Sequence, residues 1–248
     1  MIAQDKLAGR AAPYRAVFLR DGGPRAANQG PDRRAPKRGD RSQDAGVRVS
    51  RDRSGTDKGR LGVRRPLITV FGSSRAKPDD ALYQEGYTLG RLLGEAGFDV
   101  ATGGYRGVME AVSRGARTGG AHVLGVTVAS FKDEANPFTA QEIRSKDIYT
   151  RLRQLIESGD AYVALRGGMG TLCEVVFAWQ MLKLALLPAR PLVLVGQCWG
   201  AVLERWLEQL TVTESDCDCF TLTKTPEEAA AFLGVLFFAD KKAPAQPK

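Results

Sequence analysis

The sequence is poor in the side chains that hold metal ions and disulfide frameworks. Its 248 residues include a single histidine, His122, and four cysteines, at positions 173, 198, 217 and 219. No Cys-x-x-Cys pair is present, which argues against a zinc ribbon and against a disulfide framework. Cys217 and Cys219 could begin a metal site, but a pair of reduced thiols fits better because no other soft ligand stands near them. We expect no metal and no cofactor.

Long apolar runs are also missing. No stretch approaches the ~18 apolar residues that a membrane-spanning helix needs. The N-terminus has no long apolar run after its first charges, so it does not resemble a secretory signal. We therefore expect no membrane partner and a reducing, cytoplasmic location.

The net charge of +8 comes from the N-terminal quarter of the chain. Residues 1–66 carry 17 Lys and Arg against 7 Asp and Glu, whereas residues 67–248 carry 19 against 21. No aromatic residue occurs between 21 and 65, so this part cannot bury enough apolar area to offset its chain entropy. We predict a disordered basic segment over 1–62, either a solvated tail or the product of a start codon placed too early. Without aromatic residues among its arginines, it gives only weak support for nucleic-acid binding.

From residue 67 onward, short apolar runs alternate with helical patterns. Strands are predicted at 67–71, 98–102, 123–128, 161–165 and 192–195, with a short edge strand at 220–222. Helices are predicted over 79–96, 108–117, 147–158, 171–186, 201–210 and 226–238, and a polar tail over 241–248. Such alternation indicates a parallel sheet covered on both faces. The fold class is therefore α/β, a Rossmann-like doubly wound sheet forming a single domain over about 65–240. Ligands of such sheets bind at the carboxyl ends of the strands.

Glycine-rich turns follow the first two strands. Gly72, Ser73 and Ser74 come after the first and could donate hydrogen bonds to an anion, although many strand–helix turns look alike. The second turn supplies three glycines and a methionine, namely Gly103, Gly104, Gly107 and Met109. A helix that begins at Gly107 offers free N–H groups to a phosphate. A tight turn with close packing explains the same glycines, and the dinucleotide G-x-G-x-x-G pattern is absent.

The third turn follows the predicted strand at 161–165 and enters a helix. Its glycines, Gly167, Gly168 and Gly170, expose successive amides, and Thr171 is predicted to serve as the N-cap and to donate its hydroxyl. The turn lacks the lysine of a Walker A loop, which argues against a P-loop that hydrolyses triphosphates. Two glycine turns of this kind in one sheet favour a bound mononucleotide.

A carboxylate and an arginine stand out near these turns. Glu174 lies one helical turn past Thr171, where it could act as general acid or base or stabilise a sugar cation. The same Thr-x-x-Glu spacing is also the signature of a capping box. Arg151 opens the helix before the fourth strand, and a guanidinium there could face a phosphate. From spacing alone, a solvated surface position explains Arg151 better.

Two motifs together resemble the LONELY GUY (LOG) family. They are Thr102-Gly103-Gly104-Tyr105-Arg106-Gly107-Val108-Met109-Glu110 and Arg166-Gly167-Gly168-Met169-Gly170-Thr171-Leu172-Cys173-Glu174, and the resemblance covers about 67–238. It implies a Rossmann fold, a homodimer with the site near the subunit interface, and cleavage of cytokinin nucleoside 5′-monophosphates into free base and ribose 5-phosphate. It also implies two catalytic residues, which fall on Arg151 and Glu174, and no cofactor.

The chain departs from the family pattern in several places. Arg166 replaces a proline, while Thr102 and Glu110 replace glycines at the two ends of the first motif. Before Arg151 the chain reads Asp-Ile-Tyr-Thr, in place of a stretch that usually contains Met-His-Glu. These differences concern substrate identity more than phosphate binding. The extra cation at position 166 could either strengthen an anion site or obstruct it.

Three functions compete at this point. The first is a phosphoribohydrolase acting on a nucleoside monophosphate, with Glu174 as the reactive carboxylate and Arg151 as its partner. The second is a non-catalytic nucleotide or molybdenum-cofactor carrier, because related Rossmann proteins share the first motif. The third is a nucleic-acid binder that uses the basic segment. A pyridoxal-dependent decarboxylase fits worst, since no lysine stands beside the phosphate turns to form a Schiff base.

Overall fold

The computed structural model of the protein describes residues 64–239. The predicted basic segment at 1–62 and the predicted tail at 241–248 lie outside the described residues.

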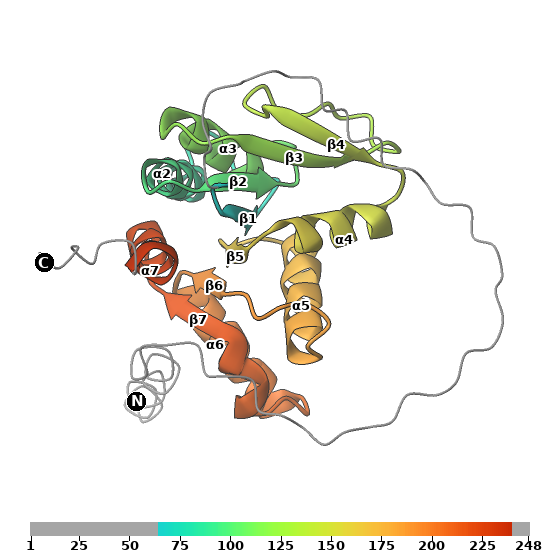
Figure 1. The fold of residues 1–248 in the computed structure, drawn as a ribbon. Coiled ribbons are helices and arrows are strands. Elements are labelled where there is room, and N and C mark those ends of the chain that lie inside the picture. The colour runs from blue at the N-terminus through green and yellow to red at the C-terminus, as the bar shows by residue number, and fades with distance from the viewer. Residues whose placement is uncertain (1–63, 240–248) are drawn as a thin grey trace, which may run out of the picture. The chain divides into compact units, whose positions relative to one another are not determined.

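Seven strands and six α-helices make up the described part of the chain (Figure 1). The strands are β1 (Leu67–Phe71), β2 (Asp99–Thr102), β3 (Val123–Val128), β4 (Gln141–Ser145), β5 (Ala161–Ala164), β6 (Leu192–Val195) and β7 (Phe220–Thr223). The helices are α2 (Ala81–Glu95), α3 (Val108–Thr118), α4 (Ile148–Ser158), α5 (Met169–Lys183), α6 (Gln197–Gln209) and α7 (Pro226–Phe238), with a short 3-10 helix η1 (Glu214–Cys219) before β7.

All seven strands run parallel in one sheet of order β4-β3-β2-β1-β5-β6-β7. The predicted α/β class is confirmed. The chain builds outward from β1 to β4 and then returns to the other side of β1, so the strand order reverses between β1 and β5. Phe71 pairs with Ala164 at the carboxyl ends of these two strands. The turns that follow them are therefore neighbours at the point where such sheets bind ligands.

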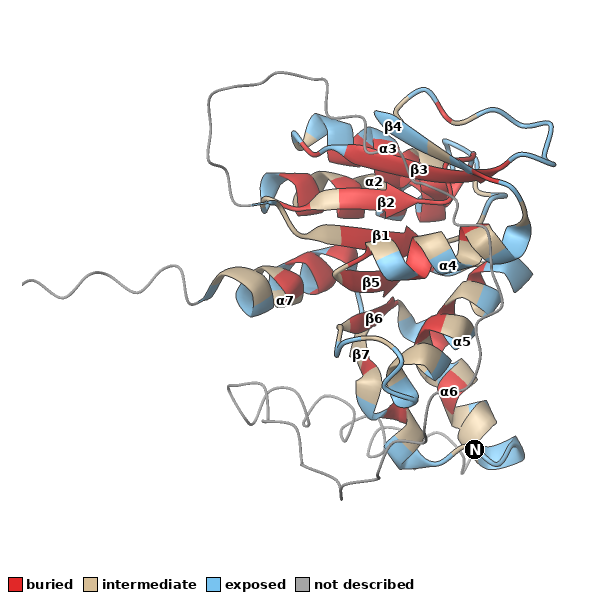
Figure 2. Ribbon diagram, turned by 45° about the vertical axis from the view of Figure 1, so that its right-hand side comes forward, coloured by how far each residue is buried: buried red, intermediate tan, exposed pale blue. Residues whose placement is uncertain are grey.

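Two apolar layers enclose the sheet, and Figure 2 shows their buried residues lining both of its faces. On one face, the side chains of β1, β2 and β5 pack against α2, α3 and α7, including Leu89, Val112 and Leu233. On the other, β5 and β6 pack against α5 and α6 through Val175 and Leu203. Strands buried on both faces need apolar residues at every position, which explains the near-continuous apolar runs in the sequence.

One strand was not predicted. β4 occupies the edge of the sheet, in a stretch where no strand was predicted, and its sequence, Gln-Glu-Ile-Arg-Ser, is largely polar. Only Ser145 is buried, and the first four residues are exposed or partly exposed. An edge strand is paired on one side only and needs no apolar run, and polar residues there protect against pairing with other chains.

Glycines bring the backbones of α2 and α3 into direct contact. A Cβ atom on Gly90 would lie 2.1 Å from the carbonyl oxygen of Val112, and one on Gly115 would lie 2.0 Å from that of Tyr87. Both separations are far shorter than van der Waals contact, so any larger side chain would push the helices apart. Because α2 and α3 follow two of the three glycine turns, this packing also fixes where those turns lie.

We expect Gly90→Ala to lower the free energy of unfolding by about 2 kcal/mol, because an overpacked core costs roughly 1–3 kcal/mol. Gly234→Ala is a matched control, since Gly234 lies in α7 with no atom within 4 Å of an added Cβ. That control should gain up to ~1 kcal/mol from the better helix propensity of alanine. Urea denaturation followed by circular dichroism measures both, and equal stability of Gly90→Ala and the wild type would refute close packing here.

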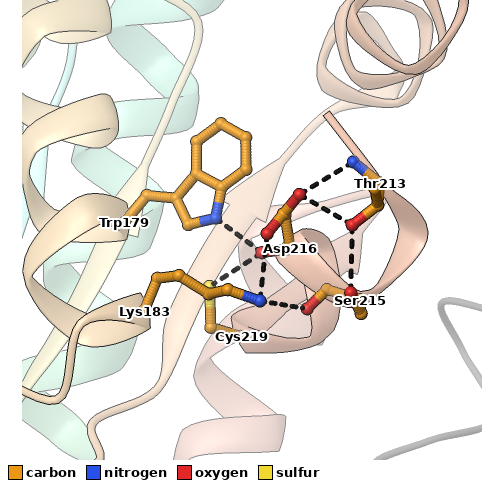
Figure 3. A network of polar contacts seen from close by, with 6 residues as sticks. All are labelled: Trp179, Lys183, Thr213, Ser215, Asp216 and Cys219. Carbon is orange, nitrogen blue, oxygen red and sulfur yellow. Dashed lines mark hydrogen bonds and ion pairs between the residues drawn. The ribbon is translucent and has the colours of Figure 1, made fainter. Parts of the chain in front are cut away.

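A polar network anchors the far end of α5 to η1 (Figure 3). The indole Nε1 of Trp179 donates to the carbonyl oxygen of Asp216 at 2.6 Å, and Lys183 Nζ lies 3.0 Å from Asp216 Oδ1. The Asp216 carboxylate also accepts from the backbone N–H and hydroxyl of Thr213, and these bonds, with Lys183, lower its pKa to about 2. Both ends of α5 are thereby fixed, one by this network and one by the glycine turn.

Candidate active site

The three glycine turns meet at Ser73. Its backbone N–H donates to the carbonyl oxygen of Arg166 in the third turn at 3.3 Å. Its own carbonyl oxygen accepts from the N–H of Val108, the first residue after the second turn, at 2.8 Å. Its hydroxyl accepts from the N–H of Arg75 at 3.1 Å. The turns predicted to bind phosphate therefore form one continuous edge rather than three separate loops.

Several of the glycines predicted to bind phosphate are required by packing. A Cβ atom on Gly72 would lie 2.4 Å from the Cγ1 of Val108, and one on Gly107 would lie 2.4 Å from the carbonyl oxygen of Ser73. Gly104 and Gly107 also have positive φ angles, of +79° and +75°, which favour glycine. For these residues the structure supports a tight, closely packed turn, so their glycine identity needs no ligand to explain it.

The third turn is open by contrast. Gly168 and Gly170 have no atom within 4 Å of an added Cβ, and both are exposed. The first helical hydrogen bond of α5 runs from Leu172 N to Gly168 O, so the N–H groups of the first turn point out of the helix end. No acidic residue lies in that turn. Its free donors and the positive end of the helix dipole suit an anion.

The predicted N-cap role of Thr171 is wrong. α5 begins at Met169 with Gly168 as its N-cap, which places Thr171 inside the first turn. Thr171 is buried, and its Oγ1 would lie 2.1 Å from a Cβ on Gly167, which explains the glycine at that position. The prediction failed because threonine is a common N-cap, whereas here the extended residue before the helix is Gly168, which caps it without a side chain. The capping box with Glu174 is excluded for the same reason.

Arg151 is buried, with 8% of its surface exposed, so the surface position favoured by spacing alone is wrong. Asp147 caps α4 by accepting from Thr150 N at 2.7 Å, and this start of the helix turns Arg151 toward the sheet. The guanidinium donates from Nε to the carbonyl oxygen of Val126 at 2.8 Å and from Nη2 to that of Gly103 at 3.2 Å. Two carbonyl oxygens from β3 and the second turn thus fix its orientation.

Arg151 and Glu174 form a buried ion pair. Arg151 Nη1 lies 3.3 Å from Glu174 Oε1, and only 10% and 13% of the two side chains are exposed. Burial raises the pKa of Glu174 to about 7, although the charge of Arg151 and its hydrogen bond act in the opposite direction. A carboxyl group with a pKa near neutrality can exchange a proton during a reaction at physiological pH, which is the property expected of a general acid or base.

Gly103 and Met109 stand directly beside this pair. A Cβ on Gly103 would lie 2.0 Å from Arg151 Nη2 and 2.6 Å from Met109 Sδ. Met109 is 9% exposed and occupies the start of α3. Gly103 was predicted to bind a ligand through its backbone. The structure shows that the absence of a side chain there makes room for Arg151 and Met109.

Two departures from the family motif have structural partners. The Thr102 hydroxyl accepts from the N–H of Gly104 at 3.1 Å and contacts Ser113 Oγ at 3.3 Å, so it stabilises the second turn. Glu110 accepts from the Tyr83 hydroxyl of α2 at 3.0 Å. Arg166 is exposed, and its carbonyl oxygen rather than its side chain contacts Ser73.

Two residues of the site were missed in the sequence. Asn136 is buried and donates from Nδ2 to the carbonyl oxygens of Gly104 and Tyr105 at 3.1 and 3.0 Å. Tyr105 places its ring 5.8 Å from the Arg151 guanidinium, and its hydroxyl accepts from Val128 N at 2.8 Å. An asparagine before a proline is typical of any loop, so no local pattern indicated that Asn136 supports the second turn.

Neither metal ligands nor membrane helices were found in the described residues. Between residues 64 and 239, no three His, Cys, Asp or Glu side chains gather closely enough to hold a metal ion. The four cysteines are free thiols, and burial raises the pKa of Cys217 and of Cys219 to about 11. None of the helices in the same part of the chain is both long and apolar enough to span a bilayer.

Comparison with known sequences identifies the family. Residues 65–216 match the sequence profile of the SLOG cluster 4 family. The chain belongs to this family. The resemblance to LOG proteins inferred from the two glycine motifs is confirmed, because sequence relatives include proteins of that name.

Three relatives illustrate the range of similarity. A probable cytokinin riboside 5′-monophosphate phosphoribohydrolase of Oryza sativa subsp. japonica, LOG4, is 35% identical over 134 residues, which cover 52% of this chain and 57% of that protein. The cytokinin riboside 5′-monophosphate phosphoribohydrolase LOG7 of Arabidopsis thaliana is 38% identical over 122 residues, covering 46% and 55%. An uncharacterised protein of Archaeoglobus fulgidus is 31% identical over 129 residues, covering 52% and 83%. The chain thus spans little more than half the length of these two phosphoribohydrolases.

Solved structures share the fold. The molybdenum cofactor binding protein of Rippkaea orientalis aligns with a TM-score of 0.58 and 23% identity over 71% of this chain and 99% of that one. The molybdenum cofactor carrier protein of Chlamydomonas reinhardtii aligns with a TM-score of 0.56 and 23% identity, over 70% and 98%. At this level of identity the likeness establishes the Rossmann-like architecture and nothing about the ligand.

Proposed function

We propose that this protein hydrolyses the N-glycosidic bond of adenine-type nucleoside 5′-monophosphates, of the cytokinin kind, to free base and ribose 5-phosphate. The observation that carries the proposal is the buried pair of Arg151 and Glu174 beside a glycine turn with free N–H groups. Relatives named as cytokinin riboside 5′-monophosphate phosphoribohydrolases, at 35–38% identity, support the reaction class.

The 5′-phosphate binds at the open start of α5 in this proposal. Gly168 and Gly170 leave room for the phosphate oxygens, and the unpaired N–H groups of the first turn donate to them. Ser73 and Ser74 lie on the adjoining turn, where their hydroxyls can add donors. Arg151 already donates from Nε, Nη1 and Nη2 to protein atoms. In this proposal the phosphate is therefore bound by the positive end of α5 and not by Arg151.

Glu174 supplies the reactive carboxylate. In the bond-breaking step the C1′–N bond cleaves, its electron pair leaves with the base, and positive charge develops on the ribose. The oxygen of the attacking water then bonds to C1′, and the proton that the water loses is taken up by the departing base. The ionised carboxylate of Glu174 stabilises that charge or takes a proton from the water that attacks C1′. Arg151, held by Val126 and Gly103, fixes the orientation of Glu174.

The proposal is tested by incubating the protein with AMP and with isopentenyl-AMP and separating the products by chromatography. We expect free base and ribose 5-phosphate from at least one of them. Nucleotide binding without any release of base would exclude the hydrolase and favour a non-catalytic carrier. The carrier is the second candidate because the fold is shared with a protein named as a molybdenum cofactor carrier.

The predicted homodimer and the predicted cytoplasmic location stay predictions. The proposed substrate is a small molecule, and binding it requires neither nucleic acid nor a membrane.

A further inference from the structure

Phe131 is an exposed aromatic residue beside the site. It lies on the loop after β3, and 46% of its surface is exposed. Complete burial of a phenylalanine side chain is favourable by roughly 1.5–3 kcal/mol. An exposed ring beside a site can therefore strengthen binding when a ligand covers it. Among the described aromatic residues, only Phe131 and Tyr149 are classed as exposed.

A chain of contacts connects Phe131 to the catalytic pair. Its ring centroid lies 5.7 Å from that of Tyr105, and the planes are tilted by 38°. The Tyr105 ring in turn lies 5.8 Å from the Arg151 guanidinium, which contacts Glu174. The hydroxyl of Tyr105 is fixed at the end of β3 by Val128 N. Two residues, Tyr105 and Arg151, thus connect the exposed ring to Glu174, where the glycosidic bond would be cleaved.

The loop that carries Phe131 is tied to the same edge of the sheet. Phe131 N donates to the carbonyl oxygen of Val128 at 3.2 Å, which closes a turn directly after β3. Two residues further on, Asp133 forms an ion pair with Arg106 of the second turn, with 3.0 Å between Oδ1 and Nη2. Contacts on both sides of Phe131 thus hold its backbone near the turn that orients Arg151.

We propose that Phe131 forms the stacking surface for the base of the nucleotide. The inference rests on the proposed function, in which the phosphate lies at the start of α5 and the ribose at Glu174. A nucleotide extends its base away from its phosphate, and successive contacts through Tyr105 and Arg151 connect Phe131 to Glu174. Base–aromatic stacking tolerates different ring substituents, which suits a family of N6-substituted adenines.

Tyr149 is the alternative surface, and its place on α4 argues against it. It is 82% exposed but stands two residues before Arg151, which corresponds to about 200° around a helix. With Arg151 turned toward the sheet, Tyr149 points away from the catalytic pair. It therefore serves as a control of the same chemical type on the same edge of the sheet.

The test compares two ligands that differ only in whether a base is present. Dissociation constants for AMP and for ribose 5-phosphate are measured by isothermal titration calorimetry for the otherwise wild-type chain, Phe131→Ala, Phe131→Tyr and Tyr149→Ala, each carrying Glu174→Gln so that bound AMP is not cleaved during the titration. We expect Phe131→Ala to weaken AMP binding about tenfold, within the range for loss of one stacked base. Ribose 5-phosphate binding should not change, Phe131→Tyr should restore AMP affinity to within about twofold of wild type, and Tyr149→Ala should bind both ligands normally.

Other outcomes overturn the inference. Equal weakening of AMP and ribose 5-phosphate by Phe131→Ala would mean that the ring only supports the loop, and unchanged AMP affinity would mean that the base binds elsewhere. The proposed hydrolysis fails separately, if the wild type binds AMP but releases no adenine, and the binding comparison still decides the role of Phe131. If the wild type binds no AMP at all, both proposals are overturned.

Discussion

Replacing Glu174 by glutamine is expected to lower the rate of base release by about 100-fold or more, the magnitude typical of losing a general acid or base. Glutamine keeps the size of the side chain and a carbonyl oxygen that Arg151 can still contact, so AMP should bind with nearly wild-type affinity. The effect should therefore lie in kcat rather than in KM. A residue that acts only in the transition state has this signature.

The matched control is Glu157→Gln, which makes the same chemical change on the exposed end of α4. Steady-state rates with AMP or isopentenyl-AMP, measured by quantifying free base, should be unchanged in that variant. If Glu174→Gln retains wild-type turnover, the carboxylate takes no part in the reaction. If neither the wild type nor Glu174→Gln releases base while both bind nucleotide equally well, the carrier function is supported instead.

Much of this architecture could be predicted from the sequence because a doubly wound sheet leaves a strong local signal. Strands buried on both faces must be apolar at each position, so Val123–Val128 and Leu192–Val195 were located to the residue. The final helix from Pro226 was also located, since proline suits the first turn of a helix. The polar strand at the edge, Gln141–Ser145, carries no such signal and was missed.

The position of the site could be predicted from the sequence, but the role of each of its residues could not. Glycine patterns indicated three turns at the carboxyl edge, yet they could not distinguish glycines required by packing, such as Gly107, from glycines that face open space, such as Gly168. That difference depends on which segments approach across the fold. The burial of Arg151 is of the same kind, because its partners Val126 and Gly103 are 25 and 48 residues away in sequence. In the sequence, only the family resemblance points to Arg151.

The second prediction concerns the free energy of unfolding and its dependence on pH, rather than turnover. The pKa of Glu174 is raised from 4.5 to about 7 in the folded protein, because burial disfavours the charged carboxylate more than Arg151 favours it. Between those two pH values the unfolded chain has lost a proton that the folded protein still holds. Folding stability therefore falls as pH rises through this window and levels off above about pH 7. Above neutral pH, the ionised carboxylate of Glu174 therefore lowers the free energy of unfolding.

Glu174→Gln should remove this pH dependence, because glutamine is neutral at every pH. At pH 4.5 the variant and the wild type should unfold with similar free energies, whereas at pH 8.5 the variant should be more stable by about 3 kcal/mol, from a shift of roughly 2.5 pH units. Urea denaturation at the two pH values measures the difference, and taking variant minus wild type cancels the titration of every other group. A difference that stays constant with pH, as expected for Glu157→Gln, would mean that Glu174 has an ordinary pKa. The same substitution would then combine lost catalysis with no gain in stability, and the buried ion pair with Arg151 would be a structural contact rather than a carboxylate held ready for proton transfer.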